Sequence, residues 1–339
     1  MQLRKECQHC VLAESTYLSH EDFENGRRLT AVDLYSANGP KVPLYKQRYY
    51  HGDIAGKAAW KLKRKNVRRN GVLRQRKKWP NGRIPYVLSI RYTSRERAVL
   101  ARAMDEYHKK TCVRFEPRSR LDRDYLYIGK IDGCFSDVGR AGGRQELSLD
   151  DGCLEYDTAI HELMHAVGFY HEHERWDRDN FIEILWSNID RDAYDQFGRV
   201  DLYESSYYGQ PYDYFSIMHY DRVAFSKNGF DTVRARQPQF TPVIGMQLDF
   251  SQIDLNKING MYNCHGRIGL HNAQQASTVI TQRPFFQTQP TFSTRSCEDK
   301  AALCWRWVDR CRSYFYEQIM RQFCAKTCGF CYTGLAWNR

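Results

Sequence analysis

A short stretch of the sequence carries three histidines and a glutamate at spacings that suit a catalytic metal. His161 and His165 are four residues apart, so on a helix both imidazoles lie on one face and can bind one Zn²⁺, with Glu162 beside them. Gly168 then allows the backbone to turn in a left-handed conformation and to bring His171 in as a third ligand. Three protein ligands leave one position for water, which is the arrangement of a catalytic zinc site.

The full spacing is H-E-x-x-H-x-x-G-x-x-H. An isolated H-E-x-x-H is also compatible with a polar surface helix, but the glycine, the third histidine and a methionine-containing segment downstream favour the zinc site. A bound zinc ion lowers the pKa of its water from about 15.7 toward about 7, which supplies a nucleophile at neutral pH. Glu162 is placed to take the proton of that water and pass it to the leaving amine. The predicted reaction is hydrolysis of a peptide bond.

The stretch resembles the metzincin metallopeptidases, and the segment H-E-x-x-R-x-D-R that begins at His171 resembles their astacin branch. This resemblance covers about residues 50–331 and is strongest over residues 134–220. It implies an α+β peptidase domain in which a mixed five-stranded sheet and long helices form two lobes around an active-site cleft. It also implies one Zn²⁺ per chain and protein or peptide substrates.

The segment from Pro211 to Tyr220 resembles the Met-turn of the same branch. By this resemblance Met218 forms an apolar floor beneath the three imidazoles. Tyr220 would be an additional zinc ligand that swings away to stabilise the oxyanion. A lone S-x-M-H-Y is also compatible with core packing, but the histidines about fifty residues earlier favour the Met-turn. His173 and His219 occupy family positions that are not ligands.

The composition is that of a folded protein in an oxidising compartment. The 339 residues are 42% hydrophobic and 27% charged, and no run approaches the length of a membrane span. Twelve cysteines predict disulfides and a secreted protein. Met1–Cys10 has no apolar signal-peptide core, which we interpret as a trimmed or alternative start. For Cys7 and Cys10, a local disulfide or free thiols are favoured over a redox site, because no strand-to-helix context surrounds them.

A basic run occupies residues 57–78, with eleven Lys or Arg and no Asp or Glu, and it accounts for the whole net charge of +11. Such a run can be a nucleic-acid arm, a solvated face or a processing site. Because it lies just upstream of the peptidase domain, we interpret it as a processing site for a trypsin-like or furin-like protease. We expect no nucleic-acid partner.

Residues 1–69 are polar, lack helical or alternating periodicity, and are predicted to be an irregular propeptide. The sequence Tyr50-His51-Gly52-Asp53 resembles the F-x-G-D motif of astacin propeptides, with Tyr in the place of Phe. The resemblance implies that Asp53 binds zinc where the catalytic water would sit and keeps the zymogen latent. A Gly-Asp pair alone is an ordinary turn.

Arg68-Arg69 is the preferred activation site, because Asn70 to Trp79 matches the distance from the mature start to a Trp in the family. The resemblance then pairs the new α-amino group of Asn70 with Glu172 in a buried salt bridge. A buried carboxylate needs such a charge partner. The basic residues of 74–78 offer competing cleavage positions.

The catalytic domain is predicted over residues 70–264. A run rich in β-branched and aromatic residues predicts a strand from Ile84 to Arg91, and Ser94 can cap a following helix. Short strands are expected around 113–116 and 124–129. A strand, a helix and two strands before the zinc helix predict a mixed sheet packed on helices.

Four cysteines of this domain pair by the family pattern, Cys134 with Cys153 and Cys112 with Cys264. The segment 139–149 resembles the astacin segment that contains the substrate-pairing edge strand, to which a peptide adds by backbone hydrogen bonds.

The remainder of the chain is predicted to be a linker at 265–296, a cysteine-rich module at 297–331 and a tail at 332–339. The module resembles a ShKT domain, a small helical fold that needs disulfides because its core is small. A zinc ribbon is the competing interpretation, which the spacing disfavours. No Lys lies between residues 312 and 323, so a targeting module with a matrix or surface partner is expected. The family pairing is Cys297–Cys331, Cys304–Cys324 and Cys311–Cys328.

The sequence therefore predicts a secreted zinc endopeptidase acting on extracellular proteins and made as a latent precursor. The alternative is a catalytically silent extracellular protein that binds through the ShKT module. The intact histidines, Glu162 and Tyr220 argue against that alternative.

Overall fold

The structure of the chain is a computed structural model, and it divides into two compact units, residues 1–269 and residues 270–339, which are considered separately. It describes residues 16–35, 52–55, 71–199, 206–264, 304, 311 and 324–330. The predicted linker 265–296 and tail 332–339 lie outside these residues.

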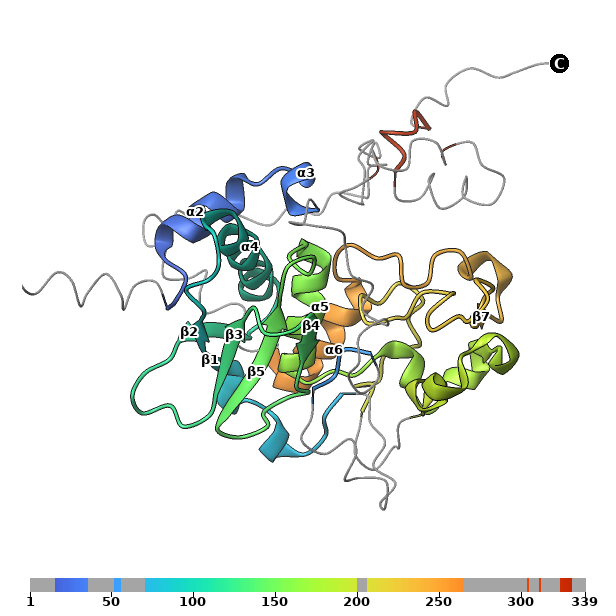
Figure 1. Cartoon of the computed structure of the whole chain (residues 1–339), viewed down its shortest axis with the longest axis horizontal. Coiled ribbons are helices and arrows are strands. Elements are labelled where there is room, and N and C mark those ends of the chain that lie inside the picture. The colour runs from blue at the N-terminus through green and yellow to red at the C-terminus, as the bar shows by residue number, and fades with distance from the viewer. Residues whose placement is uncertain are drawn as a thin grey trace, which may run out of the picture. The chain divides into compact units, whose positions relative to one another are not determined.

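The first unit is built on a five-stranded sheet in the order β2-β1-β3-β5-β4 (Figure 1). Four strands run parallel, and only the edge strand β4 is antiparallel to its neighbour β5. The predicted mixed five-stranded sheet is confirmed. The strands are β1 Arg83–Leu88, β2 Arg114–Pro117, β3 Tyr125–Gly129, β4 Cys134–Ser136 and β5 Arg144–Leu149.

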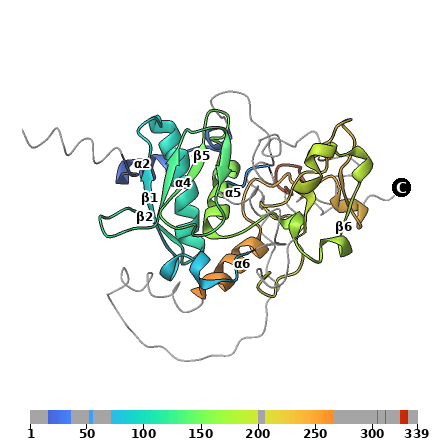
Figure 2. The ribbon, with the colours of Figure 1, turned by 60° about the horizontal axis from the view of Figure 1, so that its bottom comes forward.

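Two helices, α4 (Ser94–Lys110) and α5 (Tyr156–Val167), pack against this sheet and against each other (Figures 1 and 2). Ser94 is the first residue of α4, and the cap is Thr93. The Thr93 hydroxyl accepts a hydrogen bond from the Glu96 N–H, and the Glu96 carboxylate accepts one from the Thr93 N–H. The predicted cap at Ser94 is therefore wrong by one residue.

The expectation that residues 1–69 contain no helices is also wrong. Helix α2 spans His20–Arg28 and helix α3 spans Ala31–Leu34, and α2 lies beside α4 (Figures 1 and 2). Each helix begins with a capping box in which the third residue is Asp. These two local signals are present in the sequence. The helices are too short for a clear apolar period, so packing on α4 stabilises them.

The second lobe of this unit has a two-stranded antiparallel sheet and its own apolar core. Strands β6 (Ile182–Ile184) and β7 (Val233–Ala235) surround this core together with Phe197 and Ile244. Helix α6 (Gln252–Tyr262) returns to the first lobe, where the Tyr262 hydroxyl donates to the Val167 carbonyl at 2.7 Å.

Short 3-10 helices connect these elements in the described part of the chain. They are Gln75–Lys77, Pro80–Gly82, Glu172–Glu174, Arg178–Asn180, Trp186–Asn188, Arg191–Phe197 and Pro238–Phe240.

Disulfides join the cysteine pairs that the family pattern implies, as far as the structure describes them. Cys112 bonds to Cys264 and Cys134 to Cys153 in the first unit. In the second unit Cys304 bonds to Cys324 and Cys311 to Cys328. The pair Cys297–Cys331 lies outside the described residues. None of the helices in the described ranges is long and apolar enough to cross a membrane.

His108, near the end of α4, connects helix α2 to the sheet. Its ring stacks on Phe23 of α2 and on Phe115 of β2, with centroid distances of 6.2 and 6.3 Å. Its Nε2 accepts the Phe115 N–H at 2.9 Å. Burial, with a smaller contribution from Arg114, lowers the pKa of His108 to about 4.

This lowered pKa predicts a loss of stability in mild acid. The unfolded chain takes up the His108 proton near pH 6.5 and the folded chain only near pH 4, so protonation favours unfolding as the pH falls between these values. The contribution is up to about 3 kcal/mol. We expect His108→Gln to reduce the difference in unfolding free energy between pH 7 and pH 4, measured by urea titration at each pH. An unchanged difference would contradict the assignment to His108.

Candidate active site

Helix α5 and the turn after it bring the three predicted zinc ligands together. His161 and His165 project from one face of α5, which ends at Gly168. Gly168 has a φ of 134°, a left-handed conformation that side chains rarely adopt, and a Cβ there would lie 2.9 Å from the Val72 side chain. The glycine therefore permits the turn that carries His171 back toward the helix.

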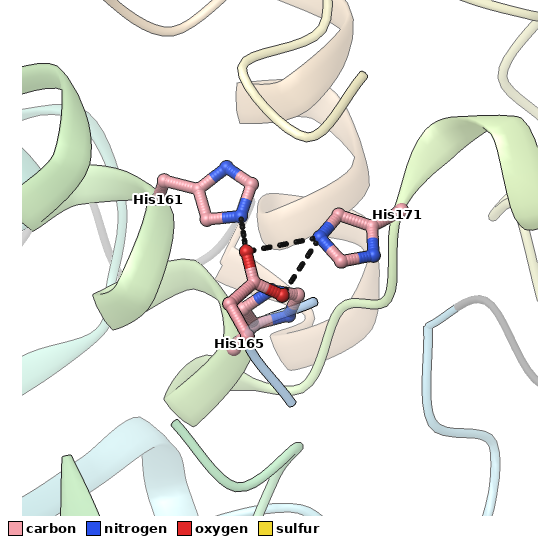
Figure 3. Close-up of side chains that lie close together, drawn as sticks. His161, His165 and His171 are labelled. Atoms are coloured by element: carbon pink, nitrogen blue, oxygen red, sulfur yellow. Dashed lines mark hydrogen bonds and ion pairs between the residues drawn. The ribbon is translucent and has the colours of Figure 1, made fainter. Parts of the chain in front are cut away.

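The carboxylate of Asp53 lies among the three imidazoles, which point toward one another in Figure 3. His161 Nε2 is 3.1 Å from Asp53 Oδ2, His165 Nε2 is 3.4 Å from Oδ1, and His171 Nε2 is 3.1 Å from Oδ1. Asp53 is fully buried, and no imidazole of the three is more than 4% exposed. The structure thus assembles the three predicted ligands and the predicted switch residue at one point.

The tautomers of these imidazoles suit a metal. His161 Nδ1 and His165 Nδ1 lie 2.8 and 2.6 Å from the backbone carbonyls of Ile217 and Phe169, so each Nδ1 carries the proton. Each Nε2 then presents a lone pair to the centre of the cluster. Of the described residues, none forms a hydrogen bond with His165 Nε2. Three imidazole nitrogens, which are neutral when they bind a metal, and a carboxylate oxygen are the ligand types that Zn²⁺ prefers, so the residues fit this ion.

The buried negative charge of Asp53 also has to be balanced by one positive charge at the cluster. Burial raises the pKa of Asp53, but the neighbouring imidazoles outweigh it and hold that pKa well below the usual range. Burial lowers the pKa of His171, but Asp53 and Glu174 outweigh it and raise the pKa to about 9. For His165 burial dominates and lowers the pKa to about 4. The site therefore holds a buried carboxylate that one positive charge must balance.

Glu162 lies on α5 beside the cluster and is not one of the four residues that could bind the metal ion. Its side chain is fully buried, and within the described residues neither carboxylate oxygen has a hydrogen-bond partner. Burial and the charge of Asp53 raise the pKa of Glu162. A carboxyl group that is not engaged by the protein is available for a proton transfer at the reacting centre.

The backbone around Asp53 occupies the edge of the main sheet. The Ser136 N–H donates to the Asp53 carbonyl at 3.0 Å, the Ala55 N–H donates to the Ser136 carbonyl at 2.9 Å, and Ile54 forms a parallel bridge with Ser136. The edge strand is therefore β4, not the 139–149 segment, which contributes the interior strand β5. After β3 the chain first forms β4 and then turns back through residues 137–143, so that β5 pairs with both β3 and β4 and leaves β4 at the outer position.

The Met-turn contacts the site through its backbone. Met218 is buried and its carbonyl accepts the Glu172 N–H at 2.9 Å, while the Ile217 carbonyl orients His161. The Tyr220 ring lies 3.9 Å from the ring of His173, stacked on it, and 4.5 Å from that of His171. The predicted roles of the Met218 side chain and of Tyr220 as a ligand stay predictions.

Two further histidines have other partners, as expected for non-ligands. His173 Nε2 lies 3.2 Å from the Gln196 carbonyl, and His219 Nε2 lies 2.7 Å from the Tyr212 hydroxyl. Neither joins the metal-ligating group.

Glu172 is held by a buried ion-pair network that sequence reasoning missed. Its Oε2 accepts from Lys257 Nζ at 2.6 Å, and its Oε1 accepts from Arg175 at 3.2 Å and from the Asp213 N–H at 2.9 Å. Burial raises the pKa of Glu172, but Lys257 and Arg175 outweigh it and lower that pKa. The predicted pairing with the α-amino group of Asn70 stays a prediction, because Asn70 lies outside the described residues.

Helix α6 supplies the cation of this network and also holds the Met-turn. Asp254 accepts from the Ser216 hydroxyl at 2.6 Å and from the Ile217 N–H at 2.9 Å. Lys257 and Asp254 lie on the same helical face as Ile258 and Met261, and all four are buried. Charged residues in an apolar stripe were the available sequence signal for this network.

Glu174 is a second residue that the sequence did not identify. It accepts the backbone N–H of His171 at 2.9 Å, and its Oε2 lies 3.4 Å from His171 Nδ1. A carboxylate beside the outer nitrogen of a ligating histidine orients the ring and raises its basicity.

Comparison with known proteins gives matches over both units. The astacin peptidase family matches residues 71–263, and the ShK-like domain matches residues 296–331. The zinc metalloproteinase nas-8 of Steinernema carpocapsae is 60% identical over 334 residues, covering 93% of this chain and 80% of that protein. The zinc metalloproteinase nas-8 of Caenorhabditis elegans is 64% identical over 291 residues, covering 85% and 72%.

A solved structure of the same kind is similar as well. High choriolytic enzyme 1, a hatching enzyme zinc-protease from the medaka fish Oryzias latipes, is 40% identical with a TM-score of 0.51. The match covers 55% of this chain and 93% of that one.

The buried pair of Glu172 with Lys257 predicts a large effect of a single substitution. Lys257→Met leaves the Glu172 carboxylate with less charge compensation, and we expect a loss of about 3 kcal/mol in unfolding free energy. Arg199→Met is the control, because Arg199 forms an ion pair with Asp179 in which both side chains are exposed. That control should cost less than about 1 kcal/mol. Equal losses in urea unfolding would contradict the buried-network interpretation.

Proposed function

The chain belongs to the astacin family of zinc metallopeptidases, and from this premise we propose that it is a secreted endopeptidase of extracellular proteins, made as a zymogen in which Asp53 blocks the zinc site. The chain is a zinc metalloendopeptidase by family, and peptide bonds are its substrates. Secretion, latency and the identity of the substrates are the proposed part.

The proposed chemistry assigns one role to each group at the site. His161, His165 and His171 hold one zinc ion, which when bound polarises the scissile carbonyl and makes water a better nucleophile. Glu162 removes the proton of the attacking water and returns it to the leaving amine nitrogen. The Tyr220 hydroxyl donates a hydrogen bond to the oxyanion.

One observation carries the proposal of latency: the Asp53 carboxylate lies among the three imidazoles, with no exposed surface. A carboxylate in this place excludes water from the metal. The adjoining backbone pairs with Ser136 on the edge strand β4, where a peptide substrate would otherwise add. Both the metal and the substrate-binding edge are thus blocked by residues 52–55.

The contacts of residues 71–79 favour cleavage at Arg68-Arg69 over the basic residues that follow. The Val72 N–H donates to the Gly168 carbonyl at 2.9 Å, the Lys77 carbonyl accepts from Arg140 at 2.7 Å, and Trp79 Nε1 donates to the Ala166 carbonyl at 2.8 Å. A protease binds its target as an extended strand. Cleavage within 74–78 would require these contacts to break first.

After cleavage the α-amino group of Asn70 would add a third cation at Glu172. Gly71 packs against Tyr208, and Tyr208 packs at Gly260, one helical turn from Lys257 on α6. Gly71, the described residue next to Asn70, is thus linked through Tyr208 to the helix that carries Lys257, which supports the proposal. Because Lys257 and Arg175 already pair with Glu172, we propose that the new terminus supplements this network.

The second unit is proposed to bind a matrix or surface partner. Its disulfides Cys304–Cys324 and Cys311–Cys328 hold together a small module, a kind of domain that depends on such cross-links for stability. The proposed organisation is a propeptide at 1–69, a catalytic domain at 70–264, a linker at 265–296, a ShKT module at 297–331 and a tail at 332–339. The cysteine pairing supports an oxidising, extracellular location.

The peptidase mechanism is tested by Glu162→Ala. The precursor and the variant are treated with trypsin, the new N-terminus is sequenced, and cleavage of a peptide library is measured. We expect kcat/KM to fall at least ~100-fold, because a general base contributes about 10²- to 10⁴-fold. Zinc content should be unchanged, since Glu162 has no ligand position. Equal rates for zinc-loaded wild type and variant would rule the mechanism out.

Latency is tested by Asp53→Ala in the unprocessed chain. Removing the carboxylate opens a metal position to water, so we expect measurable peptide cleavage without processing. Glu21→Ala, an exposed position in α2, is the control and should stay latent. If the Asp53 variant is as inactive as the control while zinc is bound, Asp53 is not the switch.

A further inference from the structure

Residues 16–35 contact the catalytic domain at a place separate from the zinc site. We define these residues, which include α2 and α3, as the anchor. They lie along α4 and the end of β1, whereas Asp53 lies at α5 and β4. The 16 residues 36–51 connect the two contacts and lie outside the described ranges.

The anchor is attached to α4 by a partly buried ion pair and by close backbone packing. Arg97 Nε and Nη2 donate to the two Asp22 oxygens at 3.1 and 2.7 Å. Burial raises the pKa of Asp22, but the hydrogen bonds from Arg97 and Ser19 outweigh it and lower that pKa. A Cβ at Gly26 would lie 2.7 Å from the Ala98 carbonyl oxygen, so the two helix backbones touch there.

Further contacts extend the anchor along the domain in both directions. The Thr16 carbonyl accepts the Leu88 N–H at the end of β1 at 2.7 Å, and the Tyr86 hydroxyl accepts the Leu18 N–H at 3.0 Å. At the other end the Tyr35 hydroxyl donates to the Leu248 carbonyl at 2.8 Å. Leu18, Leu34 and Tyr35 are all buried. An interface with buried apolar residues, paired charges and satisfied backbone groups has the features of a specific contact.

We propose that the α4 surface is a docking site for an amphipathic helical peptide, that its ligand is the anchor of this chain, and that the anchor keeps the cleaved prosegment bound. The inference rests on the proposed zymogen. Cleavage at Arg68-Arg69 lies after both contacts, so it leaves the anchor and Asp53 on one fragment. Two linked contacts dissociate far more slowly than either alone, because the second rebinds at high effective concentration. Cutting the chain is therefore not sufficient for activity, and loss or further cleavage of the anchor completes activation.

The test uses the full chain with the recognition sequence of a single-site viral protease in place of residues 64–69. After cleavage, the chain is analysed by size-exclusion chromatography at low micromolar concentration. We expect the prosegment to co-elute with the catalytic unit in the wild type and in Asp53→Ala. It should elute separately in Gly26→Leu, where the added side chain meets the backbone of Ala98. Arg28→Ala, exposed on the same helix, is the matched control and should retain the prosegment.

Activity provides the second measurement. The cleaved Gly26→Leu chain should be at least ~10-fold more active than the cleaved wild type at equal concentration, since avidity commonly changes binding by 10²- to 10⁴-fold. Its activity also shows that its catalytic domain is folded. A labelled peptide of residues 16–35 should bind the cleaved Gly26→Leu chain, whose α4 surface is vacant, and not the cleaved wild type.

Three results would overturn the docking site: separate elution of the wild-type prosegment, loss of co-elution in Asp53→Ala but not in Gly26→Leu, or no binding of the labelled peptide to either cleaved chain. Failure of the proposed latency can be distinguished from failure of the docking site, because latency is measured by the activity of the uncut Asp53→Ala chain. Retention of the prosegment is measured by co-elution in size-exclusion chromatography, which does not depend on whether the prosegment inhibits the enzyme.

Discussion

A carboxylate and three imidazole nitrogens that share a small, buried volume impose a strict electrostatic condition. All four groups present lone pairs to one another, so the arrangement is stable only with a positive charge at its centre. A zinc ion meets this condition and a proton on His171 meets it in part. The fold around the site holds these four groups in place, since local interactions alone could not bring Asp53, which is 108 residues from His161, to the histidines.

The surrounding structure meets this requirement in two ways. Backbone carbonyls of Ile217 and Phe169 set the tautomers of His161 and His165, and the Glu174 carboxylate lies beside His171. Helix α6 then holds the Met-turn through Asp254 and holds the segment after His171 through Lys257. The second lobe is thus joined to the ligands by buried polar contacts, which specify position more strictly than apolar packing does.

In the proposed zymogen, residues 16–35 and 52–55 attach to the catalytic domain through the same kinds of contact. Asp53 contributes a single side chain to the site, and the edge of β4 contributes backbone hydrogen bonds. Residues 16–35 contact α4, away from the ligands. In the proposed zymogen this separation of attachment from inhibition would allow a short inhibitory segment to act, because the anchor would keep that segment at a high local concentration.

The local spacing of residues in the sequence was enough to predict the zinc-binding histidines. His161, His165 and Gly168 are linked by helical periodicity and by a backbone conformation, so their arrangement follows from a few consecutive residues. The sheet and its main helix were predictable for the same reason, because strand and helix periods are local. Resemblance to a family added Asp53, Met218 and Tyr220, which no local rule would have connected to the histidines.

Tertiary structure alone decided the partners that are distant in sequence. Lys257 is 85 residues from Glu172, and Arg97 is 75 residues from Asp22, so neither pairing has a local signal. The helices α2 and α3 carry capping boxes but are too short to be stable without α4. Which strand forms the sheet edge depended on how the chain turns back after β4 and places β5 between β3 and β4. In each case the stabilising free energy comes from burial against a part of the chain that is distant in sequence. The pattern of neighbouring residues carries no information about that contact.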